Sequence, residues 1–193
     1  MSAIKILVIP GSIRTGSLNA RLAAVAAKAF ALAGADVTRI SLADYSLPLY
    51  DADLEAQSGV PKAAVELKRQ LGAHHGVLMV TPEYNASVPP LVKNAVDWVS
   101  RVRERGVPPL EVFHDRAYAM AAASDGPLGG TGALMALRQI LTLGCGATVI
   151  PRQLALSFAT QAFDDDDRLK LPRDAEALQA LVWQLIDVAQ AMM

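Results

Sequence analysis

The sequence is poor in cysteine, with Cys145 as the one example among 193 residues. A single cysteine excludes a disulfide framework and any metal site built from cysteines. Proteins without disulfides are typical of reducing compartments, so we expect a cytoplasmic location. The N-terminal residues enter an apolar strand pattern without the regions of a signal peptide, and no apolar run has the length of a membrane helix. The sequence therefore predicts no membrane segment.

The chain also lacks an excess of charge of either sign. Its 18 Lys and Arg residues nearly balance its 19 Asp and Glu residues, which leaves a formal net charge of -1. This balance excludes a protein that binds nucleic acid over its whole surface. The length suits one domain with a sizeable core. We therefore expect residues 1–193 to form a single domain.

Apolar runs typical of strands alternate five times with amphipathic helix patterns. The short, continuous apolar runs match strands buried on both faces, as in a parallel sheet. The alternation predicts an α/β fold with a doubly wound five-stranded parallel sheet and right-handed crossovers. Segments 42–60 and 151–173 lack a periodic pattern and are predicted to be irregular. The predicted strands span 5–10, 36–40, 76–81, 116–123 and 147–150, and the predicted helices span 18–33, 61–71, 131–143 and 174–191, with one more beginning at Pro89-Pro90.

The first predicted strand ends in a loop of small polar residues and one arginine, Gly11-Ser12-Ile13-Arg14-Thr15-Gly16-Ser17. Ser17 is a good N-cap for the helix that follows. The N–H groups and dipole of a helix N-terminus attract anions, and Arg14 adds a planar cation suited to a phosphate. The loop therefore predicts a phosphate site, and the alternative is an ordinary turn between strand and helix. Further hydrogen-bond donors are available from Ser12, Thr15, Ser17 and Asn19.

Two common nucleotide loops do not fit this stretch. Gly11 and Gly16 have the spacing of a P-loop, but Ser17 stands where the lysine of that motif is required, which disfavours NTP hydrolysis. The dinucleotide fingerprint requires a glycine at the position of Ile13. A terminal monophosphate, held by hydroxyls and one arginine, fits the loop better than a pyrophosphate.

Unusual loops also follow the third and fourth predicted strands. The backbone N–H groups, ring and amide of Pro82-Glu83-Tyr84-Asn85 can line a flat heteroaromatic ring, and the alternative is a proline-shaped turn with Glu83 solvated. The glycines of the loop from Ser124 to Gly130 let a ring pass close to the backbone or merely shape a turn. Because ligands of such sheets bind outside the carboxyl ends of the strands, we expect all three loops to converge on one site.

The residues of these loops carry a resemblance to a known family. Gly11-Ser12-Ile13-Arg14 with Ser17 and Asn19, followed by Thr81-Pro82-Glu83-Tyr84-Asn85 and Lys93-Asn94-Ala95-Val96-Asp97-Trp98, resembles the NADPH-dependent FMN reductase family. Members include quinone, chromate and azo-dye reductases. The resemblance spans about the first 150 residues. One departure is Thr131-Gly132, where close relatives often have a basic residue, and another is Pro90, near which they often have a glycine.

The resemblance implies a flavodoxin-like, three-layer αβα fold with strand order 2-1-3-4-5. It also implies a set of residues around FMN. The residues themselves indicate no catalytic side chain and no metal site. The phosphate would be held by Ser12, Arg14, Ser17, Leu18 and Asn19. The flavin ring would lie against Pro82, Glu83, Tyr84 and Asn85, with Ser124, Asp125 and Gly126 along its other edge.

The resulting hypothesis is an FMN-dependent oxidoreductase. It would pass hydride from NADPH or NADH through FMN to a small acceptor, namely a quinone, an azo compound, chromate or free flavin. A flavodoxin-type electron carrier is the first alternative, although such carriers are usually strongly acidic. A non-catalytic flavin-binding regulatory module is the second. The resemblance and the apolar helices also favour a homodimer or homotetramer.

Three other features of the sequence favour structural roles. His74-His75 lies at a predicted helix end, where capping is a better interpretation than metal binding. Cys145 lies between two glycines and is predicted to be a small buried residue. The acidic run 164–167 lacks the spacing of a calcium loop and is predicted to be solvated.

Overall fold

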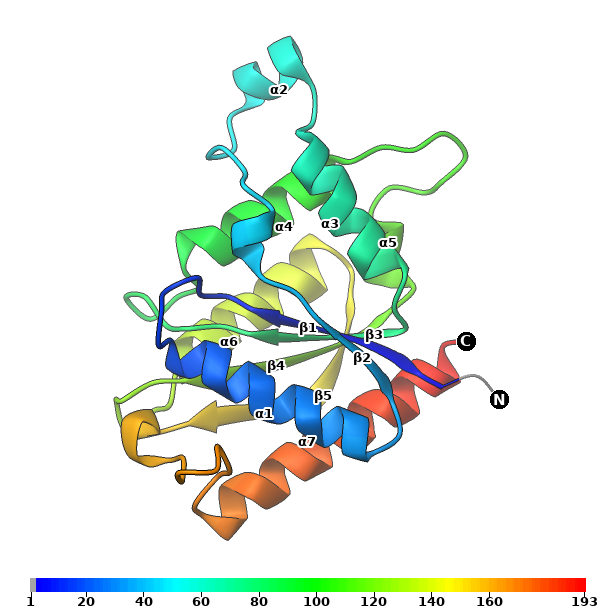
Figure 1. Ribbon diagram of the computed structural model, residues 1–193. Coiled ribbons are helices and arrows are strands. Elements are labelled where there is room, and N and C mark those ends of the chain that lie inside the picture. Colours follow the sequence, from blue (N-terminus) through cyan, green and yellow to red (C-terminus); the bar gives the residue numbers. More distant parts are fainter. Residues whose placement is uncertain (1–2) are drawn as a thin grey trace.

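A computed structural model describes residues 3–193 and contains one sheet of five parallel strands (Figure 1). The strand order is β2-β1-β3-β4-β5, which confirms the flavodoxin-like topology. Buried apolar side chains fill β1, β3 and β4, as expected for central strands of a parallel sheet. The strands are β1 (Lys5–Pro10), β2 (Asp36–Arg39), β3 (Gly76–Val80), β4 (Ala117–Ala123) and β5 (Thr148–Leu156).

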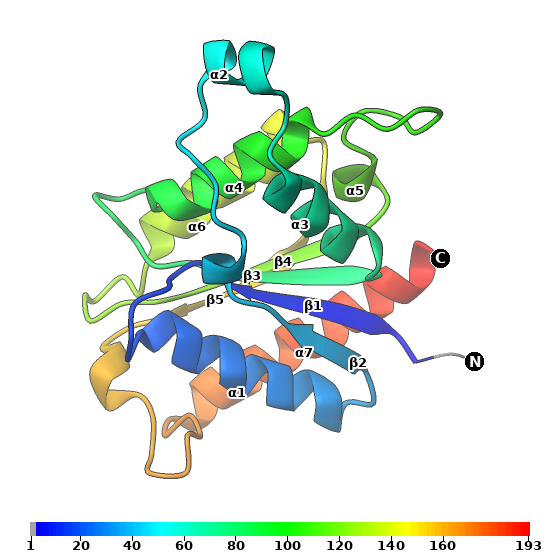
Figure 2. The same cartoon turned by 45° about the horizontal axis from the view of Figure 1, so that its top comes forward.

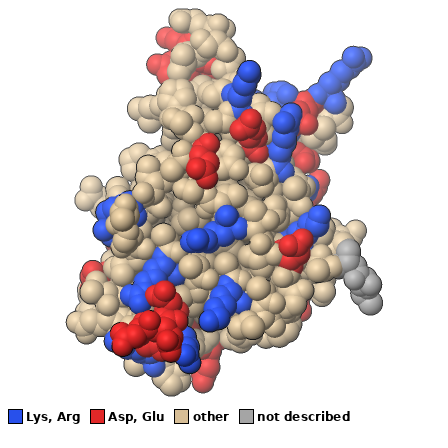
Figure 3. All heavy atoms as spheres, in the orientation of Figure 1, with Lys and Arg blue, Asp and Glu red and all other residues tan. Residues whose placement is uncertain are grey.

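Helices cover both faces of the sheet, so the fold has three layers (Figures 1 and 2). Alternate residues of β1 point to opposite sides: Ile6 belongs to the core under one layer and Leu7 to the core under the other. On the face drawn in Figure 3, basic and acidic side chains are interspersed, in keeping with the near-zero net charge. One layer consists of α1 (Leu18–Leu32) and α7 (Pro172–Ala191), and the other contains α3 (Lys62–Gly72), α4 (Pro90–Arg101) and α6 (Thr131–Gln139).

The segment from 42 to 60, expected to be irregular, contains two short helices. A 3₁₀ helix spans Leu42–Asp44, and α2 spans Ala52–Ser58. The Asp51 side chain caps α2 by accepting a hydrogen bond from Asp53 N at 2.7 Å. None of the α2 residues is buried, and the helix projects from the body of the domain (Figures 1 and 2). A seven-residue helix without a buried stripe gives no periodic signal in the sequence.

The last strand is longer than the sequence predicts. β5 continues through Pro151 to Leu156, and its pairing with β4 shifts register between Tyr118 and Met120. A proline cannot donate a ladder hydrogen bond, and such residues are tolerated at edge strands and bulges. Pro151 therefore interrupts the sequence pattern typical of a strand, although the strand itself continues.

The remaining differences from the sequence prediction concern helix ends and short turns. The helix α6 ends at Gln139 and continues as a π-helical turn, Ile140–Gly144. A four-residue helix, α5 (Glu111–His114), precedes β4, and a 3₁₀ turn, Ala159–Gln161, follows β5. Pro172 starts α7 two residues before the predicted position, because proline suits the first turn of a helix.

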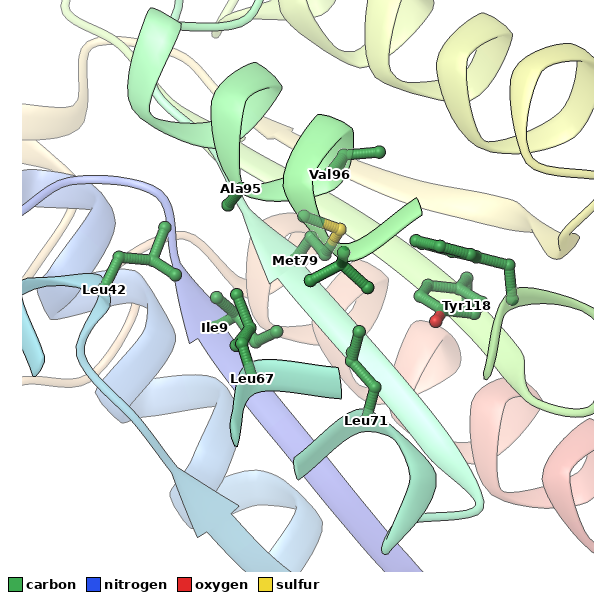
Figure 4. A pocket seen from close by; sticks show the side chains of 10 residues that line it. Ile9, Leu42, Leu67, Leu71, Met79, Ala95, Val96 and Tyr118 are labelled. Atoms are coloured by element: carbon green, nitrogen blue, oxygen red, sulfur yellow. The ribbon is translucent and has the colours of Figure 1, made fainter. Parts of the chain in front are cut away.

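A small apolar cavity lies between the sheet and the layer of α3 and α4 (Figure 4). Its volume is about 20 Å³, close to the minimum that holds one water molecule. Apolar side chains line it and offer no partner for a water, so the cavity should stay dry. Its walls include Ile9, Leu67, Leu71, Met79, Ala95 and Val99.

Filling this cavity should stabilise the domain slightly. The change Val99→Ile adds one methylene at the wall and should raise the free energy of unfolding by about 0.5–1 kcal/mol, measured by urea unfolding. The matched control is Val77→Ile, which adds the same group at a buried β3 position outside the cavity wall and should lower stability by about 1 kcal/mol or more through overpacking. Equal effects of the two changes would contradict a cavity that can accept the added group.

Candidate functional site

The loops after β1, β3 and β4 start side by side at the carboxyl edge of the sheet. In the register of the strands, Pro10 lies beside Val80, and Val80 lies beside Ala121. The backbone continues this pairing into the loops, since Gly11 N donates to Val80 O at 2.7 Å and Thr81 N donates to Ala121 O at 2.9 Å. The prediction that the three loops start at one edge of the sheet is confirmed, and their use as one ligand site stays a prediction.

The first loop leads into α1 through a capped turn. Ser17 is buried, and its hydroxyl oxygen accepts a hydrogen bond from Ala20 N at 3.3 Å, which confirms it as the N-cap. The N–H groups of Leu18 and Asn19, at the start of the helix, have no acceptor within the helix. Ser12 is half-buried earlier in the same loop, and its hydroxyl accepts from Arg14 N at 3.4 Å. This end of α1 therefore presents backbone donors and hydroxyls together.

Arg14 is exposed at the tip of the same loop. Its guanidinium donates to two backbone carbonyl oxygens, Thr15 O at 3.3 Å and Gly16 O at 3.5 Å. Among residues 3–193 no carboxylate forms an ion pair with it. The positive charge is therefore left for an anion at the helix N-terminus.

Asn19 fastens the first loop to the end of β4. The side chain is 4% exposed. Its Nδ2 donates to Ala123 O at 2.8 Å, and its Oδ1 accepts from Ala123 N at 2.9 Å. A side-chain amide has two N–H donors, so one of them remains for a ligand. These two hydrogen bonds of Asn19 position the first loop relative to the third loop, which begins after Ala123.

The second loop is a tight, left-handed turn. Tyr84 and Ser87 exchange backbone hydrogen bonds of 2.9 and 3.1 Å. The two residues between them, Asn85 and Ala86, have φ angles of 50° and 60°. Positive φ is strained for alanine, and such strain is typical of functional sites. Tyr84 is 56% exposed at this turn, so its ring is available to border a ligand.

Glu83 joins the second loop to α6. Its Oε2 accepts a hydrogen bond from Ala133 N at 3.0 Å, which places a carboxylate at the positive end of the helix. A Cβ at Gly132 would lie 2.8 Å from this oxygen and 3.0 Å from Ala86 Cα. The glycine at 132, a departure from the family pattern, thus permits close packing of the loop on α6. Glu83 is therefore half-buried and hydrogen-bonded, which differs from the alternative of a solvated side chain.

The third loop is held from two sides. Ser124 Oγ accepts from Gly126 N at 3.3 Å within the loop. The Asp125 carboxylate accepts from Thr160 N at 2.7 Å and from Thr160 Oγ1 at 2.8 Å. These two hydrogen bonds lower the pKa of the Asp125 carboxyl below its usual value. The sequence offered no signal for Thr160, because it lies in the segment without periodicity.

Two glycines of the third loop fit tightly against neighbouring strands. A Cβ at Gly129 would lie 2.7 Å from the backbone carbonyl of Ala155, and one at Gly130 would lie 2.6 Å from Ala122 Cβ. Both residues have positive φ, 60° and 88°. Close packing and positive φ account for glycine at both positions, and the passage of a ring close to this loop stays a prediction.

Features outside the three loops have structural roles. Cys145 is 4% exposed, and burial raises the pKa of its thiol to about 11, which keeps the thiol protonated and unreactive. His74 Nδ1 lies 2.6 Å from Gln70 O in the last turn of α3, which confirms the capping role. Within residues 3–193, no three His, Cys, Asp or Glu side chains are grouped as metal ligands.

None of the helices in the described part of the chain combines the length and the apolar character needed to cross a bilayer.

Comparisons with known proteins agree with this geometry. The model of the family described as NADPH-dependent FMN reductase matches residues 4–161. An NAD(P)H-dependent FMN reductase of Pseudomonas aeruginosa is 36% identical over 177 residues, which cover 91% of this chain and 90% of the relative. A quinone reductase of Escherichia coli K12 is 37% identical over 139 residues, covering 72% of this chain and 69% of the relative.

A solved structure is similar over nearly the whole chain. FerB of Paracoccus denitrificans, a flavoenzyme NAD(P)H:(acceptor) oxidoreductase, superimposes with a TM-score of 0.80 at 28% identity, covering 98% of this chain and 99% of FerB. The matched region contains all three loops and the sheet that positions them. The chain therefore belongs to the NADPH-dependent FMN reductase family.

Proposed function

We propose that this chain is an FMN-dependent oxidoreductase that takes hydride from NAD(P)H and reduces a quinone. The observation that carries the proposal is the junction of three loops at the carboxyl edge of the sheet, with an arginine that has no carboxylate partner at the N-terminus of α1. A flavodoxin-like fold places its ligand at this edge. The names of the quinone reductase of E. coli and of FerB support a quinone or another small acceptor.

The donor set of the first loop fits a terminal monophosphate. The phosphate would lie at the start of α1, where the N–H groups of Leu18 and Asn19 meet the helix dipole. Arg14 would neutralise charge from the open side, and hydroxyls would supply the remaining donors. The Ser17 hydroxyl oxygen already accepts from Ala20 N, so its own proton is left to donate. The residues proposed to hold the phosphate are Ser12, Arg14, Ser17, Leu18 and Asn19.

The flavin ring would lie between the second and third loops. FMN supplies the two-electron chemistry when bound, and the chain orients it. The turn at Asn85 and Ala86 leaves the Tyr84 ring exposed, and this ring would border the side open to substrates. Backbone N–H groups of the loops would stabilise negative charge on the reduced ring. The residues proposed to line the ring are Pro82, Glu83, Tyr84 and Asn85 on one side and Ser124, Asp125 and Gly126 on the other.

Several finer expectations stay predictions. Azo compounds, chromate and free flavin remain proposed acceptors beside quinones. A homodimer or homotetramer is supported by exposed apolar side chains on and beside α6, Leu128, Met135 and Leu143. A cytoplasmic location stays a proposal, in keeping with the scarcity of cysteine.

The proposal is tested by FMN uptake followed by turnover. Purified protein should show a flavin absorption spectrum with one FMN per chain, and it should oxidise NADPH or NADH continuously when a benzoquinone is supplied. A flavodoxin-type carrier or a regulatory module would bind FMN without sustained turnover. Protein that takes up no added FMN would contradict the proposal outright.

A further inference from the structure

A second pocket lies on the other side of the first loop, toward β2. It has a volume of about 320 Å³. Its wall at the β1 end is formed by the loop already described, and its other wall is formed by the end of β2 and the 3₁₀ helix that follows. The site proposed for FMN uses the loops after β1, β3 and β4, so this pocket shares the first loop and the start of α1 with that site and adds the end of β2 and the 3₁₀ helix. The residues that matter here are Ser12, Ile13, Arg14, Arg39, Ser41 and Asp44.

Within the described residues, the Arg39 side chain forms no ion pair that would account for a cation at this place. It is the last residue of β2 and pairs with Val8 in the sheet, so its backbone is fixed. Its side chain is exposed, and within the described chain no carboxylate lies within ion-pair distance of it. Arg14, on the opposite wall, is likewise unpaired with any carboxylate. Because the proposed function assigns Arg14 to the FMN phosphate, Arg39 is the guanidinium of this pocket that is left for a second phosphate.

The same pocket has an apolar surface. Ile13 is 57% exposed at the tip of the first loop, and Ile40 is half-buried on the opposite wall. An exposed isoleucine beside two arginines gives a planar, largely apolar ring a surface to lie on. Hydroxyls of Ser12 and Ser41 are also present, and Ser41 is held by accepting a hydrogen bond from Ala43 N at 3.2 Å. The Arg39 guanidinium, the Ser41 hydroxyl and the apolar wall together match a phosphorylated nucleoside.

We propose that this pocket holds the adenosine end of NADPH, with Arg39 on the ribose 2′-phosphate, and that Arg39 makes the enzyme prefer NADPH to NADH. The inference rests on the proposed function, because that function requires a nicotinamide nucleotide at the same edge of the sheet. NADH lacks the 2′-phosphate and would gain nothing from Arg39. Asp44 is the one carboxylate in the pocket wall, and it opposes the same phosphate group by repulsion.

Calorimetry with nucleotide fragments on FMN-saturated protein tests the proposal without turnover. Adenosine 2′,5′-bisphosphate should bind about tenfold more tightly than 5′-AMP, a ratio expected for one charge-assisted contact at an exposed site. Arg39→Ala should remove this advantage while leaving 5′-AMP binding unchanged, and Arg39→Lys should keep part of it. Asp44→Asn should change affinity in the opposite direction, tightening the bisphosphate about twofold to fivefold. The matched control is Arg105→Ala, at an exposed arginine of the loop between α4 and α5.

Three outcomes would overturn the assignment. The first is equal weakening of both fragments in Arg39→Ala, which would show a structural role. The second is equal affinity of the two fragments in the unchanged protein. The third is release of FMN by the bisphosphate, which would place the fragment in the FMN phosphate site. FMN uptake is read separately from the flavin spectrum, so a failure of the proposed function is distinguished from a failure of this assignment.

Discussion

Replacing Gly129 by alanine should lower the free energy of unfolding by roughly 2–5 kcal/mol, from left-handed strain together with overpacking. Gly129 has a φ of 60°. An added Cβ would lie 2.7 Å from both the carbonyl carbon and the oxygen of Ala155 and 2.8 Å from Ser157 N. All three atoms belong to backbone at the end of β5 and just after it, so no side chain can rotate away to make room. The loop itself must move.

The matched control for this change is Gly144→Ala. Nothing lies within 4 Å of a Cβ built at Gly144, and the residue ends a helical turn. Alanine should be neutral there or stabilise by up to about 1 kcal/mol, because it is the better helix former. Urea unfolding of both variants, followed by circular dichroism, gives the comparison. Similar losses of stability in the two variants would contradict the packing explanation.

The variant Gly129→Ala also tests whether the third loop belongs to the proposed FMN site. Gly129 supports the third loop, in which Asp125 is already fixed by Thr160. Displacement of the loop should weaken FMN binding even where Gly129→Ala remains folded, whereas Gly144→Ala should leave FMN binding unchanged. A destabilised variant with unaltered FMN affinity would remove this loop from the proposed flavin site.

The sequence predicted the sheet and the convergence of the loops for a simple physical reason. Strands buried on both faces, such as β1 and β4, must be continuous apolar runs, and parallel strands place their carboxyl ends together. Ser17 was identifiable for a similar reason, because an N-cap depends on its neighbours in the chain alone. Local chemistry and simple topology therefore account for what could be predicted.

The contacts that connect the loops could not be predicted. Glu83 bonds to a helix start 50 residues away, and Asn19 bonds to a strand end 104 residues away. An isolated sequence contains no signal that joins such pairs, so Glu83 was equally consistent with a solvated turn. Pro151 made the predicted last strand too short, since a bulge lets an edge strand continue through a proline. The long-range contacts emerge once the sheet register is known.

Arg14→Ala should weaken FMN binding about tenfold to a hundredfold, since a hydrogen bond to a charged group contributes about 1.5–3 kcal/mol. The guanidinium has backbone carbonyls as its hydrogen-bond acceptors within residues 3–193, so its removal breaks no ion pair and should leave the fold intact. Riboflavin, which lacks the phosphate, should bind the variant almost as well as it binds the unchanged protein. The ratio of the two affinities therefore measures the phosphate contact alone.

Fluorescence quenching of the flavin gives both dissociation constants at one ionic strength, and raising the salt concentration should reduce the difference between FMN and riboflavin. Arg105→Ala is the matched control because it removes an exposed arginine from the loop between α4 and α5. It should change neither affinity. Equal weakening of FMN and riboflavin in Arg14→Ala would mean that the arginine shapes the loop rather than binding the phosphate. In that case the start of α1 and the hydroxyls of Ser12 and Ser17 would have to hold the phosphate without a cation.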